Sequence, residues 1–414
     1  MAFRDAALRY GRGNWKAQQG RLLQLYAQGG ATVSVRVDPG LHREIHSFGG
    51  HDVELCMNCG NCTAVCPLSE ESGTSFPRRI IHLLQVGRAD KLAQTADPWL
   101  CYYCGECSES CPRNANPGET MMATRRYLTA RYDWTGLAGL FYKSAAAEIM
   151  ALVLVGLFVV ALFLVFHGPV VTSHVELNRF APVRWVEFGD LVMAAVLTFF
   201  LLTNASRMAW NFMGGSQLLK ISPLVYLQQI PTFLVHFFTQ KRWRRCGSER
   251  SKRRWLTHLV LVSGYLSMLT LVLVLLRWFQ TDEIHPFYHP QRLWGYYATG
   301  ALLYATVDFM ISRWRKAEPI HRFSEASDWI FLIMLFLTAL TGIIMHAARI
   351  AGLPVATYVT YVIHLAVAVP MLVVEVPFGK WAHLFYRPLA IYLKSVKEAA
   401  ATRAREAPAA AVEA

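Results

Sequence analysis

Six stretches of about 20 apolar residues follow one another between residues 143 and 380, and they restrict the fold of this chain more than any other feature. An α-helix of that length crosses the hydrocarbon core of a bilayer. Residues 1–142, by contrast, are mixed and polar. We therefore predict an all-α chain, in which a helical soluble domain is fused to a six-helix transmembrane bundle. The predicted spans are 145–167, 187–209, 256–279, 293–313, 328–349 and 357–379.

The chain is basic, with 41 Lys and Arg residues against 28 Asp and Glu residues. Such an excess can indicate nucleic-acid binding. The largest basic cluster, KRWRRCGSERSKRRW at 241–255, lies directly before a predicted span, whereas the loops on the opposite side of the bundle carry few basic residues. Positive charge distributed in this way sets membrane topology. We therefore expect no nucleic-acid partner, a multi-pass protein in contact with lipid in the cytoplasmic membrane, and both the soluble domain and the C-terminus in the cytoplasm.

The soluble domain contains eight of the nine cysteines, in the runs CMNCGNCTAVCP (56–67) and CYYCGECSESCP (101–112). Both runs have the spacing C-x2-C-x2-C-x3-C-P, which is typical of bacterial ferredoxins with [4Fe–4S] clusters. Structural zinc is the alternative, but a zinc site needs only pairs of cysteines. Because the first 55 residues contain no secretory signal, we expect a reducing compartment, where clustered cysteines bind metal.

In two-cluster ferredoxins, the fourth cysteine of each run ligates the other cluster. The predicted ligands are Cys56, Cys59, Cys62 and Cys111 for the first cluster, and Cys101, Cys104, Cys107 and Cys66 for the second. The ninth cysteine, Cys246, stands apart in the basic loop, and we expect it to be a bystander thiol.

Histidines in or beside the predicted spans indicate haem b, which needs two axial ligands at matching depth on facing helices. His258 begins the third span and His383 follows the sixth span, so both lie near the cytoplasmic face and form the predicted ligands of an inner haem. His364 precedes His383 by nineteen residues, about 28 Å along a straight helix. It is therefore placed to bind a second haem near the outer surface.

The cysteine runs, with DPWLCYYCGECSESCPRNANPGE at 97–119, resemble the small iron–sulfur subunit of heterodisulfide reductases. Their fusion to a membrane helix through YLTARYDWTGLAGLFYKS resembles the C-type membrane subunit of the quinone-interacting membrane-bound oxidoreductase (Qmo) complex. The segment HLAVAVPMLVVEVPFGKWAHLFYRPL resembles the last span of the dihaem gamma subunit of respiratory nitrate reductase. This resemblance implies His364 and His383 as haem ligands, with His258 as the inner partner.

The chain departs from the nitrate reductase pattern at the outer partner. Met268 stands close to the position where that family has a second histidine. His346, at the outer end of the fifth span, has a depth suited to His364. We expect His346 to be the outer partner and keep Met268 as the alternative, so the chain binds one or two haems.

The resemblances imply a quinone-linked oxidoreductase subunit that transfers electrons between menaquinone, haem b and two [4Fe–4S] clusters. Its expected partners are soluble flavin and iron–sulfur subunits of the same complex and, indirectly, adenylylsulfate reductase of dissimilatory sulfur metabolism. The chain has no nucleotide-binding motif, so we expect substrate chemistry to belong to those partners. One alternative is the membrane subunit of a heterodisulfide-reductase-like complex. Another is a cluster-bearing membrane anchor without haem.

Two acidic residues, Glu375 and Asp308, lie within predicted spans. A carboxylate near a quinone can act as an acid or base, but we expect structural pairing with a neighbour such as Lys380 or Arg313. The predicted domain organisation consists of an N-terminal extension (1–45), a two-cluster domain (46–130), a linker (131–144), a transmembrane haem domain (145–396) and a disordered, Ala-rich tail (397–414).

Overall fold

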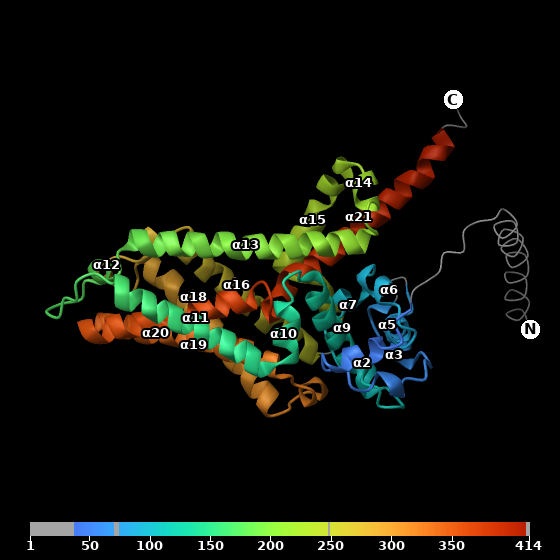
Figure 1. Cartoon of the computed structure of the whole chain (residues 1–414), viewed down its shortest axis with the longest axis horizontal. Helices are drawn as coiled ribbons and strands as arrows, with labels where there is room; N and C mark the ends of the chain where they lie inside the picture. The colour runs from blue at the N-terminus through green and yellow to red at the C-terminus, as the bar shows by residue number, and fades with distance from the viewer. Residues whose placement is uncertain (1–36, 70–73, 247–248, 411–414) are drawn as a thin grey trace, which may run out of the picture. The chain divides into compact units, whose positions relative to one another are not determined.

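The computed structural model describes residues 37–69, 74–246 and 249–410, and within these ranges it contains helices and turns but no strand (Figure 1). The all-α prediction is therefore confirmed. Residues 1–36 of the predicted extension and residues 411–414 of the predicted tail lie outside the described ranges.

A bundle of long helices forms the larger part of the chain. Its members are α11 (Ala145–Phe166), α13 (Val183–Met213), α16 (Glu249–Leu273), α18 (Pro290–Trp314), α19 (Ala326–Ile350) and α20 (Pro354–Glu375). Five of them, all except α18, are long and apolar enough to cross a membrane. Helix α18 corresponds to the fourth predicted span and packs against α16 and α19, and it buries the polar Gln291 and Arg292. The six helices that we predicted are thus present as a bundle.

The outer surface of the bundle is apolar, as a membrane protein requires. On α11, Phe158 is 62% exposed and Leu164 is 74% exposed. Large exposed apolar surfaces of this kind mark contact with another protein or with a membrane. Together with the lengths of the helices, they indicate a multi-pass membrane protein.

The soluble domain consists of short helices around α9 (Pro117–Tyr132). The short helices are α2 (Leu41–His46), α3 (Asn61–Ala64), α5 (Arg78–Gln85), α6 (Ala89–Ala93), α7 (Asp97–Leu100) and α8 (Glu106–Glu109). Leu41 and Ile45 of α2 are fully buried in the same core as Ile80 of α5. This core therefore includes residues that we assigned to the extension, because two apolar side chains four positions apart share one face of α2.

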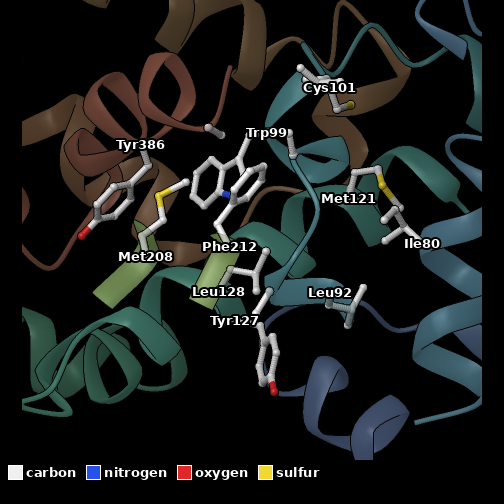
Figure 2. Packing of buried hydrophobic residues seen from close by; sticks show 14 of the residues in the cluster. Ile80, Leu92, Trp99, Cys101, Met121, Tyr127, Leu128, Met208, Phe212 and Tyr386 are labelled. Atoms are coloured by element: carbon white, nitrogen blue, oxygen red, sulfur yellow. The ribbon is translucent and has the colours of Figure 1, made fainter. Parts of the chain in front are cut away.

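The core of the soluble domain continues into the bundle through α7, α13 and the last helix, α21 (His383–Ala410). Trp99 of α7 meets the ring of Tyr386 of α21 at a centroid distance of 5.7 Å. Figure 2 shows Trp99 beside Tyr386 and beside Met208 and Phe212 of α13. The cysteine loops are thus fixed to the bundle by a shared hydrophobic core.

Two segments that we expected to be irregular are helical. The predicted linker contains α10 (Leu137–Lys143), which buries Ala138 and Phe141 against the end of the bundle. The expectation of a disordered tail from residue 397 is wrong up to Ala410, because α21 continues to that residue. Alanine, glutamate and arginine favour helix strongly, and this local preference outweighs the low complexity of the segment.

Candidate cofactor sites

The two cysteine runs fold into matching loops. Asn58 and Tyr103 each have φ of +55°, and Gly60 and Gly105 have φ of +90° and +93°. Short helices, α3 and α8, begin directly after these glycines. Left-handed backbone at two positions of each loop turns the chain tightly. The first three cysteines of each run therefore surround a small space.

Backbone N–H groups point at sulfur atoms in both loops. The N–H of Asn58 donates to Cys56 Sγ at 3.4 Å, and the N–H of Tyr103 donates to Cys101 Sγ at 3.3 Å. A third bond joins the N–H of Ala115 to Cys111 Sγ at 3.4 Å. Such bonds stabilise negative sulfur and help to set the reduction potential of a cluster.

The thiols form two groups that each combine both runs. Burial, followed by the nearby thiols of Cys56 and Cys111, raises the pKa of Cys62 to about 11. Burial, followed by the thiols of Cys101 and Cys104, raises the pKa of Cys66 to about 12. The structure thus brings the fourth cysteine of each run to the first three of the other. The assignment of individual ligands to each cluster stays a prediction.

The thiols do not converge on single points. Within the described part of the chain, no three His, Cys, Asp or Glu side chains are placed to hold one metal ion together. A zinc site needs its sulfur atoms about 2.3 Å from one ion. A [4Fe–4S] cluster is held by four thiolates and fits the wider spacing.

Cys246 is not the bystander that we expected. Its side chain is buried, and it lines a small pocket together with the four cysteines of the second group, Cys66, Cys101, Cys104 and Cys107. A hydrogen bond from Cys246 lowers the pKa of Cys104 to about 7. Sequence spacing gave no signal for this contact, because Cys246 reaches the pocket from the loop before α16.

His258 and His383 lie next to each other, as predicted for the inner haem. Their ring centroids are 6.0 Å apart and the rings make an angle of 67°. Metal–imidazole bonds are about 2 Å long, so two rings on opposite sides of one metal have centroids on the order of 6 Å apart. The two rings therefore have a separation that suits axial ligation.

The hydrogen bonds of the two rings agree with this role. His383 Nδ1 is bonded to the carbonyl oxygen of Lys380, which leaves Nε2 for a metal. A ligating histidine usually has such a partner on its other nitrogen. His258 Nδ1 is buried and has no hydrogen-bond partner among the described residues. The residues present thus fit the axial positions of a haem.

Aromatic rings connect this histidine pair to the second cysteine loop. Trp243 stacks on Tyr102 at a centroid distance of 5.3 Å, and its ring also lies 5.3 Å from that of His258. Arg387, one turn after His383, donates to the carbonyl of Cys101 at 3.1 Å. The second cysteine group and the histidine pair are therefore in contact through two separate routes.

A second candidate site is a cavity of about 380 Å³ inside the bundle, near the ends of α16 and α19 that lie away from the cysteine loops. Its walls are mainly apolar and include Met268, His346 and His364. The ring of His364 lies against Gly342 of α19, where an added Cβ would come within 3.2 Å of the ring. His364 Nδ1 is 3.1 Å from Thr341 Oγ1. Both alternatives for the outer partner thus line the same cavity as His364.

The ring of His346 is engaged elsewhere. Arg292 Nη1 lies 2.6 Å from its Nε2, and Tyr296 Oη lies 3.0 Å from the same atom. Over the ranges that the structure describes, the rings of His346 and His364 are not in contact as those of His258 and His383 are. This arrangement favours the alternative, Met268, over His346.

Two buried arginines of the cavity have unpaired nitrogen atoms. Arg292 and Arg349 are 6% and 8% exposed and both line the cavity. Arg292 Nε, Arg292 Nη2 and Arg349 Nε have no hydrogen-bond partner in the described ranges. A buried guanidinium without a full set of acceptors indicates an anionic group that is absent from the chain itself. We did not predict these arginines, because neither residue belongs to a motif.

The intramembrane acids have other partners than we expected. Asp308 pairs with Arg253 instead of Arg313, and Arg313 lies 3.4 Å from Asp328. Glu375 Oε2 accepts a hydrogen bond from the backbone N–H of Lys380 at 2.9 Å. The Lys380 ammonium group pairs with Asp328. The expectation of a structural partner was right for Asp308 in kind but wrong in the residue.

Comparisons with known proteins concern the cysteine domain. Residues 52–115 match the family model of the 4Fe-4S dicluster domain. A protein from Archaeoglobus profundus that is described as like the C-type subunit of heterodisulfide reductase is 35% identical over 94 residues, which are 23% of this chain. The chain spans 50% of the length of that relative. No solved structure matches the chain.

Geometry and comparisons together define a class. The chain carries an iron–sulfur electron-transfer domain with two [4Fe–4S] clusters, similar to the one in that heterodisulfide-reductase-like relative. This domain is continuous with a bundle that has five helices able to cross a membrane. The chain is thus an electron-transfer subunit of the kind associated with oxidoreductase complexes.

Proposed function

We propose that this chain transfers electrons between the menaquinone pool and soluble flavin and iron–sulfur partner subunits, through haem b and two [4Fe–4S] clusters. The observation that carries the proposal is the pair His258–His383, whose rings lie 6.0 Å apart. A bound haem supplies a one-electron carrier at this position. The two histidines hold it axially, and Lys380 orients the ring of His383 through its carbonyl oxygen.

The order of the centres follows from the contacts of Trp243. Trp243 lies between Tyr102 of the second cysteine run and His258. The cluster of the second group is therefore the one that exchanges electrons with the inner haem. Cys59 of the first group is exposed, and the neighbouring Met57 is 71% exposed. The first cluster is thus placed to exchange electrons with a soluble partner.

The cavity beside His364 fits a second haem. His364 and Met268 face it from two helices, α20 and α16, with His346 as the other candidate ligand. The unpaired nitrogens of Arg292 and Arg349 suit the carboxylates of haem propionates, because guanidinium binds carboxylate strongly. We propose that this second haem receives electrons from menaquinol or returns them to menaquinone.

The identity of the complex rests on resemblance. The fusion of the cysteine domain to a membrane bundle favours a Qmo-type complex that serves adenylylsulfate reductase, with the cysteine domain in the cytoplasm. The similarity to the archaeal protein fits a heterodisulfide-reductase-like complex equally well. Isolation of the complex from its native membrane, followed by identification of the associated subunits, separates the two.

Haem content tests the proposal against a cluster-bearing anchor. The purified chain is expected to bind b-type haem, visible in reduced-minus-oxidised spectra and countable as pyridine haemochrome, with about eight iron atoms per chain in its two [4Fe–4S] clusters. Two haems per chain support the outer site, and one haem confines ligation to His258 and His383. A chain that contains the clusters but no haem is an anchor, and the proposal is then wrong.

A further inference from the structure

Two buried carboxyl groups meet where α11 packs against α20. Glu148 lies in the first turn of α11 and Glu375 is the last residue of α20. Their side chains are in contact, and the residues are 1% and 0% exposed. Neither residue has an Arg or Lys side chain as an ion-pair partner among the described residues. Sequence analysis singled out Glu375 but not Glu148.

The contact lacks a hydrogen-bond donor. Glu375 Oε2 accepts from the N–H of Lys380 at 2.9 Å. Glu148 Oε2 and Glu375 Oε1 are buried and have no partner among the residues that the structure describes. An ionised carboxylate only accepts hydrogen bonds, whereas a protonated one also donates. Two carboxylates in contact cannot both be ionised at low cost. One proton between them supplies the missing donor.

The pair lies close to the inner histidines. Lys380 donates its backbone N–H to Glu375, and its carbonyl oxygen is bonded to His383 Nδ1. One residue therefore separates the carboxyl pair from the predicted axial ligand. Charge added at a buried centre acts strongly on a neighbouring acid, because the local dielectric constant is low.

The geometry points to Glu148 and Glu375 as a proton-binding site that holds one shared proton in the resting protein and takes up a second when the adjacent redox centre gains an electron. This inference rests on the proposed function for its redox part. One electron arrives at the centre, one proton from water binds the carboxylate of the pair, and both carboxyl groups are then neutral. Oxidation of the centre releases the second proton.

Polar side chains connect the region of the pair to the soluble domain. Lys380 pairs with Asp328, and Asp328 lies 3.4 Å from Arg126 of α9. Arg126 pairs with Glu119 at 3.1 Å. The titratable groups that face the pair from the other elements are Tyr142 of α10, Asp328 of α19 and Lys380. The proton is therefore exchanged at the end of the bundle that carries the cysteine loops.

Infrared spectroscopy of the full-length purified chain tests the shared proton. The wild-type protein should show the carbonyl band of a buried protonated carboxyl group, and Glu148→Gln with Glu375→Gln should abolish it. Asp308→Asn is the matched control, since Asp308 is an intramembrane acid paired with Arg253. Retention of the cluster signals in electron paramagnetic resonance shows that the double variant is folded. An unchanged band in the folded double variant overturns the inference.

The redox part is tested by potentiometry of the haem at several pH values. Uptake of one proton per electron lowers the midpoint potential by about 59 mV for each unit of pH. The double Gln variant should lose this slope, and Asp308→Asn should keep it. The same slope in all three proteins overturns the coupling. A wild-type chain without haem would overturn the proposed function and the coupling together, and the infrared band then still decides whether the pair holds a proton.

Discussion

His383 shows how a single side chain is prepared for ligation by its neighbours. Its Nδ1 is bonded to the carbonyl of Lys380, and its ring faces His258. Arg387, on the next turn of α21, is anchored on the carbonyls of Trp99 and Cys101. The ring therefore has a fixed orientation that also depends on the second cysteine loop.

His383→Ala or His258→Ala should remove the inner haem, because one remaining imidazole cannot supply both axial ligands. The haem count should fall by one per chain, while the electron paramagnetic resonance signals of both clusters persist. His82→Ala is the control, since His82 is an exposed histidine of α5. If the haem count of His383→Ala equals that of the wild type, the assignment of this ligand is wrong.

Cys246 is the residue through which the loop before α16 touches a cluster. Its hydrogen bond to Cys104 stabilises negative sulfur. Loss of one hydrogen bond costs about 1 kcal/mol, which corresponds to about 40 mV for a one-electron couple. Cys246→Ala should therefore lower the potential of the second cluster by tens of millivolts and leave the first unchanged.

Potentiometric titration followed by electron paramagnetic resonance measures this shift. Cys246→Ser is the control, because its hydroxyl group keeps a hydrogen-bond donor. Equal potentials of the second cluster in Cys246→Ala and in the wild type would show that the thiol does not act on it.

At the scale of elements, small residues set the spacing of the bundle. A Cβ on Gly264 of α16 would lie 2.8 Å from Ala301 Cβ and 3.0 Å from the carbonyl oxygen of Ala298 on α18. Gly156 of α11 similarly meets the carbonyl of Ala366 on α20 at 2.9 Å. Small residues allow membrane helices to approach closely in this way.

Gly264→Leu should force α16 away from α18 and lower the free energy of unfolding by about 1–3 kcal/mol. Gly300→Leu is the matched control, because a Cβ at Gly300 of α18 meets nothing within 4 Å. Thermal unfolding followed by loss of haem absorption compares the two. Equal midpoints would contradict the close packing of α16 on α18.

Sequence analysis predicted those elements whose signal is local. Six apolar stretches gave the six helices, and cysteine spacing gave a match to the dicluster domain at residues 52–115. The helical tail was missed because low complexity was taken as the stronger signal, although alanine favours helix. At the sites, contacts between distant segments carried no signal in one sequence, as for Cys246, Glu148 and Arg292. His346 was chosen by depth alone, and depth does not reveal its hydrogen bonds to Arg292 and Tyr296.

At the scale of the whole molecule, the cysteine loops and the bundle form one body. Trp99 joins them through contacts with Tyr132 and Tyr386. Trp243 lies between the second cysteine run and His258. Because these rings are packed in a common core, the distance between the second cluster and the inner haem is fixed. This rigidity suits electron transfer along a defined route.

The rate at which a menaquinone analogue oxidises the pre-reduced clusters tests this route most directly. Stopped-flow spectroscopy on the purified chain in lipid nanodiscs follows clusters and haem separately. We predict that His258→Ala slows oxidation of the clusters at least tenfold, and that Trp243→Leu slows it while the haem count is unchanged. Oxidation of the clusters at the wild-type rate in a His258→Ala chain that lacks the inner haem would contradict transfer through the bundle.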